Sequence, residues 1–277
     1  NLMKIEKLVR VVSDLRGQGK DVVLVSSGAI AAGRQALGRH RKPDTLAEKQ
    51  AFAAVGQARL MMIYQKLFAE YNQTAAQVLL TKDTMVNDSS RYNAQNTFDE
   101  LLNLGTIPIV NENDTISVSE LMFTDNDELS GLIASMMDAQ ALIILSNIDG
   151  IYNGSPADPN SSVIQEIGHG KDLSNYIQAS KSSFGRGGML TKTNIARKVA
   201  DEGITVIIAN GKRDNILVDL LQRPQNTLCT RFIPSKEPVS SVKKWIAHSE
   251  GFAKGEIHIN ECATEVLNSE KAVSILP

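Results

Sequence analysis

Two short apolar segments with polar residues at both ends constrain the fold more than any other feature of the chain. They are residues 107–110 (IPIV) and residues 141–146 (ALIILS), and the pattern is typical of strands buried on both faces of a parallel sheet. Polar residues 111–114 follow the first segment and Asn147 follows the second, while residues 125–127 begin a helical pattern between them. Ligands of open parallel sheets bind beyond the carboxyl ends of the strands, so we expect these polar residues to converge on one crevice.

Asparagine and aspartate after a strand are also ordinary turn and helix-cap residues, and each cluster alone fits that interpretation equally well. Three such clusters within one short stretch favour a binding site. A calcium loop fits poorly, because Leu129 occupies a ligand position and Ser130 occupies the position that requires glycine.

The chain has 277 residues, enough for one large α/β domain and a small second one. Its net charge of −2 argues against a protein whose main activity is binding the nucleic acid backbone. Cys229 and Cys262 form no CxxC pair, so we expect no metal site, no disulfide framework and an intracellular setting. No apolar run approaches the length of a membrane span, and we predict a cytoplasmic protein.

Apolar periodicity predicts the elements of the first 104 residues. They are a helix over residues 1–20, a buried strand over 21–26, a helix of small residues after Ser27 and Gly28, a long helix over 44–71, a strand over 75–80 and a helix over 97–104. We expect the long helix to break near Gly56, because glycine is unfavourable inside a helix. Residues 81–96 are polar and fit either a loop at the edge of a site or solvated surface. Residues 117–123 alternate in part, which suggests a small hairpin over the crevice.

Two glycine-containing turns could hold an anion. Gly28 lies between the strand and the helix of small residues, where free backbone N–H groups are expected, although close packing explains the same residues. The second turn, residues 183–192, runs into a helix; it is neither a Walker A loop nor GxGxxG, since Thr191 and Leu190 stand where glycines are required. A nest of N–H groups with Lys192 in the first turn suits a phosphate, and a flexible connector is the alternative.

The sequence pattern of the last third of the chain changes near residue 235. Before it, the pattern predicts a core strand over 205–209, a helix over 214–221 and an edge strand over 227–233. After it come a polar hinge and short strand-like pieces. We therefore expect a large domain over residues 1–235, and a hinge with part of a small second domain over residues 236–277.

Five ordered motifs carry a resemblance to a known family. They are VSSGAIAAG (25–33), AAVGQARL (53–60), NENDTISVSE (111–120), TDNDELSGLIA (124–134) and GRGGMLTK (185–192). In this order and spacing the chain resembles the glutamate 5-kinase branch of the amino acid kinase family. The resemblance implies a three-layer αβα sandwich around a mainly parallel central sheet, and the tail resembles the start of a small β-rich PUA domain.

The same resemblance implies an activity, its ligands and its regulation. The enzyme would use ATP, with Mg²⁺ carried on the nucleotide phosphates, to phosphorylate the γ-carboxylate of L-glutamate, giving γ-glutamyl phosphate as the first step of proline biosynthesis. Proline would be a feedback inhibitor, and the protein would be a homo-oligomer, a dimer or a tetramer. A γ-carboxylate is already ionised near pH 7, so the reaction needs no general base, and the four histidines can be structural.

Site residues carried over from the family fall into three groups. Those matched to substrate binding are Ser27, Gly28, Asn111, Asp114 and Asn126. Those matched to ATP binding are Ser146, Asn147, Arg186, Gly187, Gly188, Met189, Leu190, Thr191 and Lys192; Asn147 stands where relatives usually carry aspartate. Lys192 would neutralise the moving phosphoryl group and Asp127 would orient the lysine, with no metal ligand in the protein.

Two departures from the family leave alternatives open. One is that the PUA-like tail stops at Pro277, before a whole domain could be formed. The family begins with a strand bearing Lys-x-Gly-Thr/Ser, and the sequence printed from Asn1 lacks it, so we expect the natural protein to have an upstream segment that activity requires. Another amino acid kinase, acting on acetylglutamate or aspartate, would share the phosphate residues and differ around Asp114 and Asn126. A non-catalytic RNA-binding or regulatory relative is the alternative of another class.

Overall fold

The computed structural model describes residues 2–117, 125–168 and 188–236. The helices are α1 (Leu2–Gly17), α2 (Ala29–Ala36), α3 (Leu46–Ala69), α4 (Lys82–Val86), α5 (Asp88–Asn103), α6 (Asn126–Met136), α8 (Gly188–Asp201) and α9 (Ile216–Gln222), with a 3₁₀ turn, η1 (Pro224–Asn226). The strands are β1 (Leu24–Val25), β2 (Ala75–Leu80), β3 (Ile107–Glu112), β4 (Ala141–Ser146), β5 (Glu166–Ile167), β6 (Thr205–Asn210) and β7 (Thr230–Phe232). None of the helices so described is long and apolar enough to cross a membrane.

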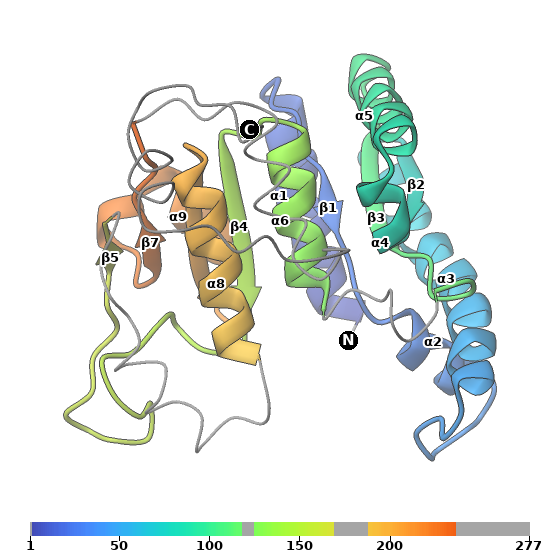
Figure 1. Cartoon of the computed structure of the whole chain (residues 1–277), viewed down its shortest axis with the longest axis horizontal. Coiled ribbons are helices and arrows are strands. Elements are labelled where there is room, and N and C mark those ends of the chain that lie inside the picture. Colours follow the sequence, from blue (N-terminus) through green and yellow to red (C-terminus); the bar gives the residue numbers. More distant parts are fainter. Residues whose placement is uncertain (1, 118–124, 169–187, 237–277) are drawn as a thin grey trace, which may run out of the picture.

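The strands form two sheets, which Figure 1 shows side by side. One has the order β1-β3-β2 and is entirely parallel, with Leu24 opposite Ile109 and Ala75 opposite Ile107. The other has the order β4-β6-β7-β5; β4 pairs with β6 and β5 with β7 in parallel, and β6 pairs with β7 antiparallel. The predicted mainly parallel α/β fold is therefore confirmed.

Helices cover both faces of each sheet and so produce three layers. One face of the β1-β3-β2 sheet packs against α1 and α3, where Val9, Phe68 and Ile107 share a buried cluster. Its other face packs against α4, α5 and α6 through a second cluster. The β6 strand packs against α8 on one side and α9 on the other. Helix α6 contacts β1, β3, β4 and α8, so it links the two sheets.

The predicted break of the long helix at Gly56 is wrong. Helix α3 is continuous from Leu46 to Ala69, and Gly56 faces α2 rather than ending the helix. A Cβ at Gly56 would lie 1.7 Å from the carbonyl oxygen of Ala29, and one at Gly33 would lie 1.8 Å from that of Phe52. The two glycines therefore allow the backbones of α2 and α3 to touch, which offsets the lower helix propensity of glycine.

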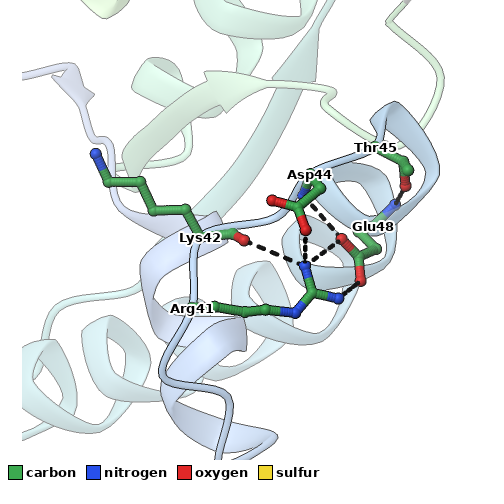
Figure 2. A network of polar contacts seen from close by, with 5 residues as sticks. All are labelled: Arg41, Lys42, Asp44, Thr45 and Glu48. Carbon is green, nitrogen blue, oxygen red and sulfur yellow. Dashed lines mark hydrogen bonds and ion pairs between the residues drawn. The ribbon is translucent and has the colours of Figure 1, made fainter.

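Side-chain caps set the start of α3. Figure 2 shows Thr45 accepting a hydrogen bond from the N–H of Glu48 at 3.1 Å, while Glu48 accepts from the N–H of Asp44 at 2.8 Å. Arg41, in the loop that joins α2 and α3, forms ion pairs with the carboxylates of Asp44 and Glu48. Since an N-cap satisfies N–H groups that have no partner inside the helix, α3 begins at Leu46.

Caps also explain why residues 82–86 and 88–96 are helical and not the loop that we gave as one alternative; the other alternative, solvated surface, agrees with the exposure of residues 87–89, 92 and 93. Thr81 caps α4 by accepting from the N–H of Thr84 at 3.3 Å, and Asn87 caps α5 by accepting from the N–H of Ser90 at 3.1 Å. Polar composition suggested a loop, but the helix face with Phe98 is buried against β3 and α6.

Four strand predictions also need correction. Strand β1 is shorter than the predicted 21–26, and β3 extends to Glu112 because its pairing with β2 continues through Asn111. Strand β4 is not buried on both faces, since Ala141 and Leu145 on one face are exposed. Strand β7 was predicted at an edge and lies between β6 and β5. The predicted hairpin, the start of the glycine-rich turn and the PUA-like tail fall mostly or wholly outside the described residues.

Candidate active site

The first turn of α6 meets the carboxyl ends of β1 and β3. Nδ2 of Asn126 donates hydrogen bonds to the carbonyl oxygen of Ser26 at 2.8 Å and to Oδ1 of Asn111 at 3.1 Å. Ser26 directly follows β1, and Asn111 lies near the end of β3. Polar residues from two strand ends and one helix therefore converge, as the position of polar residues after parallel strands predicted.

A side-chain cap and an ion pair hold this turn of α6. Asp125 accepts from the backbone N–H groups of Asp127 at 3.0 Å and Glu128 at 3.2 Å. Burial raises the pKa of the Asp125 carboxyl, and the charge of Asp127 raises it further. On the other side, Nζ of Lys82 in α4 lies 3.0 Å from Oε1 of Glu128, and both side chains are mostly buried. The turn is thus tied to α4 as well as to the strand ends.

A second ion pair crosses from α6 to α8. Nζ of Lys192 donates to Oδ2 of Asp127, and the two side chains are only 19% and 17% exposed. Lys192 lies near the start of α8, where free backbone N–H groups and the helix dipole favour an anion. Lys192, which we predicted to neutralise a phosphoryl group, is therefore in contact with Asp127, which we predicted to orient the lysine.

Ser27 and Gly28 form the exposed turn between β1 and α2. Gly28 has a φ of 107°, in the left-handed region that residues with a Cβ rarely adopt. The first N–H groups of α2 have no partner within the helix, so this turn can bind an anionic oxygen.

Asp114 lies in the turn that follows β3. The N–H of Asn113 donates to the carbonyl oxygen of Leu80 at 2.7 Å, and the N–H of Ser117 donates to that of Asn113 at 3.1 Å. Burial raises the pKa of the Asp114 carboxyl. Within residues 2–117, 125–168 and 188–236 its side chain has no hydrogen bond, so the carboxylate is available for the cationic group of a ligand.

A cavity of about 670 Å³ adjoins the ends of β4 and β6, within the range of roughly 300–1,000 Å³ that small-molecule sites occupy. Ser146, Asn147 and Lys192, which we predicted to bind the nucleotide, all line it. Its basic lining residues are Lys4, Lys7, Arg10, Lys192, Lys212 and Arg213. Positive charge lining a cavity raises the local concentration of anions such as polyphosphates.

The other residues predicted for ATP lie in or before the first turn of α8. Gly188, Met189, Leu190 and Thr191 begin the helix, and Met189 packs against the core around β6. Arg186 and Gly187 lie outside the described residues. The described ranges contain no group of three or more His, Cys, Asp or Glu side chains that could hold a metal ion.

Comparison with known proteins places the chain in one family. Residues 1–210 match the model of the amino acid kinase family. The chain belongs to the amino acid kinase family. Among its relatives, the glutamate 5-kinase of Bacteroides thetaiotaomicron is 69% identical over the whole chain, which covers 77% of that protein. The glutamate 5-kinase of Synechococcus sp. (strain JA-3-3Ab) is 45% identical over 98% of the chain and 72% of that protein.

Solved structures of other kinases share the fold of this amino acid kinase at low sequence identity. UMP kinase from Ureaplasma parvum has a TM-score of 0.55 at 14% identity, covering 84% of this chain and 90% of that one. An isopentenyl phosphate kinase substrate complex has a TM-score of 0.54 at 13% identity, with the same coverage. At these identities the likeness concerns the fold alone.

Our sequence reasoning missed a polar cluster at one edge of the cavity of this kinase. Asp149 accepts from Nδ2 of Asn210 at 2.9 Å and from Nε of Arg213 at 2.8 Å. Burial alone would raise the pKa of Asp149, but the hydrogen bonds from Asn210 and Arg213, with the charge of Arg213, lower it overall. The signal was present in the sequence, because Asp149 follows β4 as Asn147 does, Asn210 is the last residue of β6, and Arg213 follows β6.

Sequence reasoning also missed Gln57. It lies in the AAVGQARL motif on α3, is 8% exposed, and accepts a hydrogen bond from Nδ2 of Asn111 at 2.9 Å. The motif contributed to the family resemblance, but it assigned no role to this glutamine. A glutamine inside an amphipathic helix carries no local sign of a partner 54 residues away.

Proposed function

We propose that this chain transfers the γ-phosphoryl group of ATP to the γ-carboxylate of L-glutamate, the first step of proline biosynthesis. The observation that carries the proposal is the 69% identity, over the whole chain, to a relative named glutamate 5-kinase. The converging polar residues at the ends of β1 and β3, beside a basic cavity at the ends of β4 and β6, support it.

The acceptor site would lie at the ends of β1 and β3. Asp114 and Asn126 would bind the ammonium group of glutamate, and Ser27 and Gly28 would hold carboxylate or phosphoryl oxygens at the start of α2. A partly buried carboxylate at Asp114, which has no hydrogen-bond partner among the described residues, favours a free ammonium over an acetylated amine, because an amide has no charge to offset it. This favours glutamate over acetylglutamate as the substrate.

The nucleotide would lie in the basic cavity, against Ser146, Asn147 and the residues from Arg186 to Lys192. Magnesium bound to the nucleotide phosphates would supply further positive charge. The glutamate γ-carboxylate is already ionised near pH 7, so the protein has no proton to remove. Its task is to align the reactants and to neutralise the charge of the transferred group. Lys192 would perform the neutralisation, and Asp127 would hold its ammonium in position.

A direct assay tests the proposal. Purified protein in its natural length, incubated with Mg-ATP, L-glutamate and hydroxylamine, should form γ-glutamyl hydroxamate. N-acetylglutamate and aspartate should react far more slowly under the same conditions. Equal turnover of either competitor would assign the chain to another amino acid kinase, and no turnover of any of them would favour a non-catalytic relative.

The proposal extends to regulation and organisation. Proline would inhibit by binding at or beside the glutamate pocket. The protein would be a cytoplasmic homo-oligomer whose kinase domain spans residues 1–235, followed by a hinge and a partial PUA-like domain over residues 236–277. The resemblance supports these points. Proline titrated into the hydroxamate assay should lower the rate, and activity that stays constant up to millimolar proline would reject the regulatory part.

A further inference from the structure

Three side-chain amides form a directional chain beside the proposed acceptor site. It runs from Asn126 on α6 to Asn111 on β3, with Nδ2 donating to Oδ1 at 3.1 Å, and from Asn111 to Gln57 on α3, with Nδ2 donating to Oε1 at 2.9 Å. Asn111 is 3% exposed and Gln57 is 8% exposed. Buried polar groups depend on such partners, because water cannot replace them.

The backbone determines the direction of this chain. The carbonyl oxygen of Ser26 can only accept, so the atom of Asn126 that lies 2.8 Å from it must be Nδ2. The same Nδ2 faces Asn111, which must therefore present Oδ1, and this turns Nδ2 of Asn111 toward Gln57. Gln57 must then present Oε1, so a flip of any one amide would bring like groups together.

The two ends of the chain are left with different free groups. Oδ1 of Asn126 has no hydrogen-bond partner among the described residues, and an amide oxygen is an acceptor suited to an ammonium group. At the other end, Nε2 of Gln57 is buried and also has no partner within the described ranges. Only the oxygen of Gln57 therefore takes part in the chain.

We propose that Gln57 is a positioning residue for the amino acid substrate: by accepting from Asn111, it holds the Asn111 and Asn126 amides in the orientation that leaves Oδ1 of Asn126 for the substrate ammonium. Gln57 itself does not touch the substrate. This inference rests on the proposed function, because it takes an amino acid as the acceptor. It adds a residue on α3 to a site otherwise built from strand ends and α6.

Two substitutions distinguish the contribution of the Gln57 acceptor oxygen from that of the volume of its side chain. Gln57→Met keeps the length of the side chain and removes the acceptor, so Nδ2 of Asn111 loses its partner. Gln57→Glu keeps an acceptor oxygen and replaces only Nε2, which makes no hydrogen bond in the described structure. Gln65→Met is the matched control, because Gln65 is an exposed glutamine about two turns further along α3.

The test measures KM for glutamate, KM for ATP and the melting temperature of each variant. Gln57→Met should raise the glutamate KM about tenfold and leave the ATP KM within about twofold. Gln57→Glu, although its buried carboxyl lowers the melting temperature, should keep the glutamate KM within about threefold of the natural protein. Gln65→Met should change none of the three values. A lower melting temperature in Gln57→Met with an unchanged glutamate KM would show a structural role only and overturn the proposal.

A double-mutant cycle provides the second readout. In an Asn111→Ala background the effect of Gln57→Met on the glutamate KM should disappear, because the proposal makes Gln57 act only through Asn111. Full additivity of the two effects would overturn it. A failure of the proposed function would be detected in a different experiment, the hydroxamate assay, in which the natural protein would form no γ-glutamyl hydroxamate. The same mutant cycle would then be measured with the amino acid that the protein does phosphorylate.

Discussion

The two halves of the candidate site are built from different kinds of side chain. At the ends of β1 and β3 the contacts include a chain of uncharged amides, in which Asn111 and Gln57 are buried, Asn126 is partly buried, and the three are hydrogen-bonded in sequence. At the ends of β4 and β6 the residues line an open cavity, and many carry positive charge, such as Lys212 and Arg213.

This difference separates two ways of recognising a ligand. Buried amides have few alternative partners, so they hold one arrangement and can discriminate between acceptors of different shape and polarity. Charges beside an open cavity remain hydrated and attract a polyanion with less geometric demand. The ion pair between Asp127 and Lys192 joins the halves, since one residue comes from α6 and the other from α8.

The largest expected effect comes from removing the ion pair between Asp127 and Lys192. Lys192→Ala should lower kcat by about 10²–10³-fold and raise the glutamate KM far less, because the ammonium is most needed when charge moves in the transition state. Steady-state kinetics of the folded variant measure both. Lys66→Ala, at an exposed position on α3, is the control. If Lys192→Ala retains most of its kcat, Lys192 is structural and the halves are not joined as we propose.

The next effect should be confined to the acceptor half. Asp114→Ala and Asn126→Ala should each raise the glutamate KM by about 10–100-fold, because the substrate ammonium loses a partner worth roughly 1–3 kcal/mol. The ATP KM should change little. Initial rates over a grid of glutamate and ATP concentrations separate the two values. An equal rise in both would mean that the two halves do not bind their ligands independently.

Gly56→Ala tests whether the acceptor half of the site depends on the close packing of α2 against α3. The new Cβ would meet the backbone of α2 at Ala29, so the free energy of unfolding should fall by about 1–3 kcal/mol. Because Gly28 directly precedes α2 and Gln57 lies on α3, the glutamate KM should rise more than the ATP KM. Gly17→Ala is the matched control, since a Cβ there meets no atom within 4 Å. Chemical denaturation with equal stability for both variants would contradict the packing argument.

The smallest effect concerns the edge of the open half and depends on pH. The pKa of Asp149 is lower in the folded protein, so its ion pair stabilises the fold above the unfolded pKa of about 3.9, and this stabilisation is lost as the pH falls through the folded value. Asp149→Asn should therefore lower the free energy of unfolding at pH 7 by at most about 1 kcal/mol, since Arg213 is 42% exposed. Denaturation at several pH values should show this difference shrinking below about pH 4. A difference that grows in acid would refute the lowered pKa.

Local sequence patterns determined the elements and the place of the site. The apolar run at residues 75–80 coincides with β2, and the run at 107–110 lies within β3. Polar residues after parallel strands were enough to predict that Asn111 and Asn126 lie together, because strand direction alone brings carboxyl ends together. The mainly parallel α/β fold followed from the same alternation of strands and helices.

Only the tertiary structure decided which residues touch across long stretches of chain. Gly56 looks like a helix breaker by propensity, and its role became visible only where α2 approaches it. Gln57 and Asn111 are 54 residues apart, and Asp149 and Asn210 are 61 apart, so neither pair leaves a local pattern. Periodicity and turn chemistry are properties of neighbouring residues, whereas the partner of a buried polar group depends on how whole elements pack. This is why the sequence indicated the region of the candidate site but not the side chains that hold its residues in place.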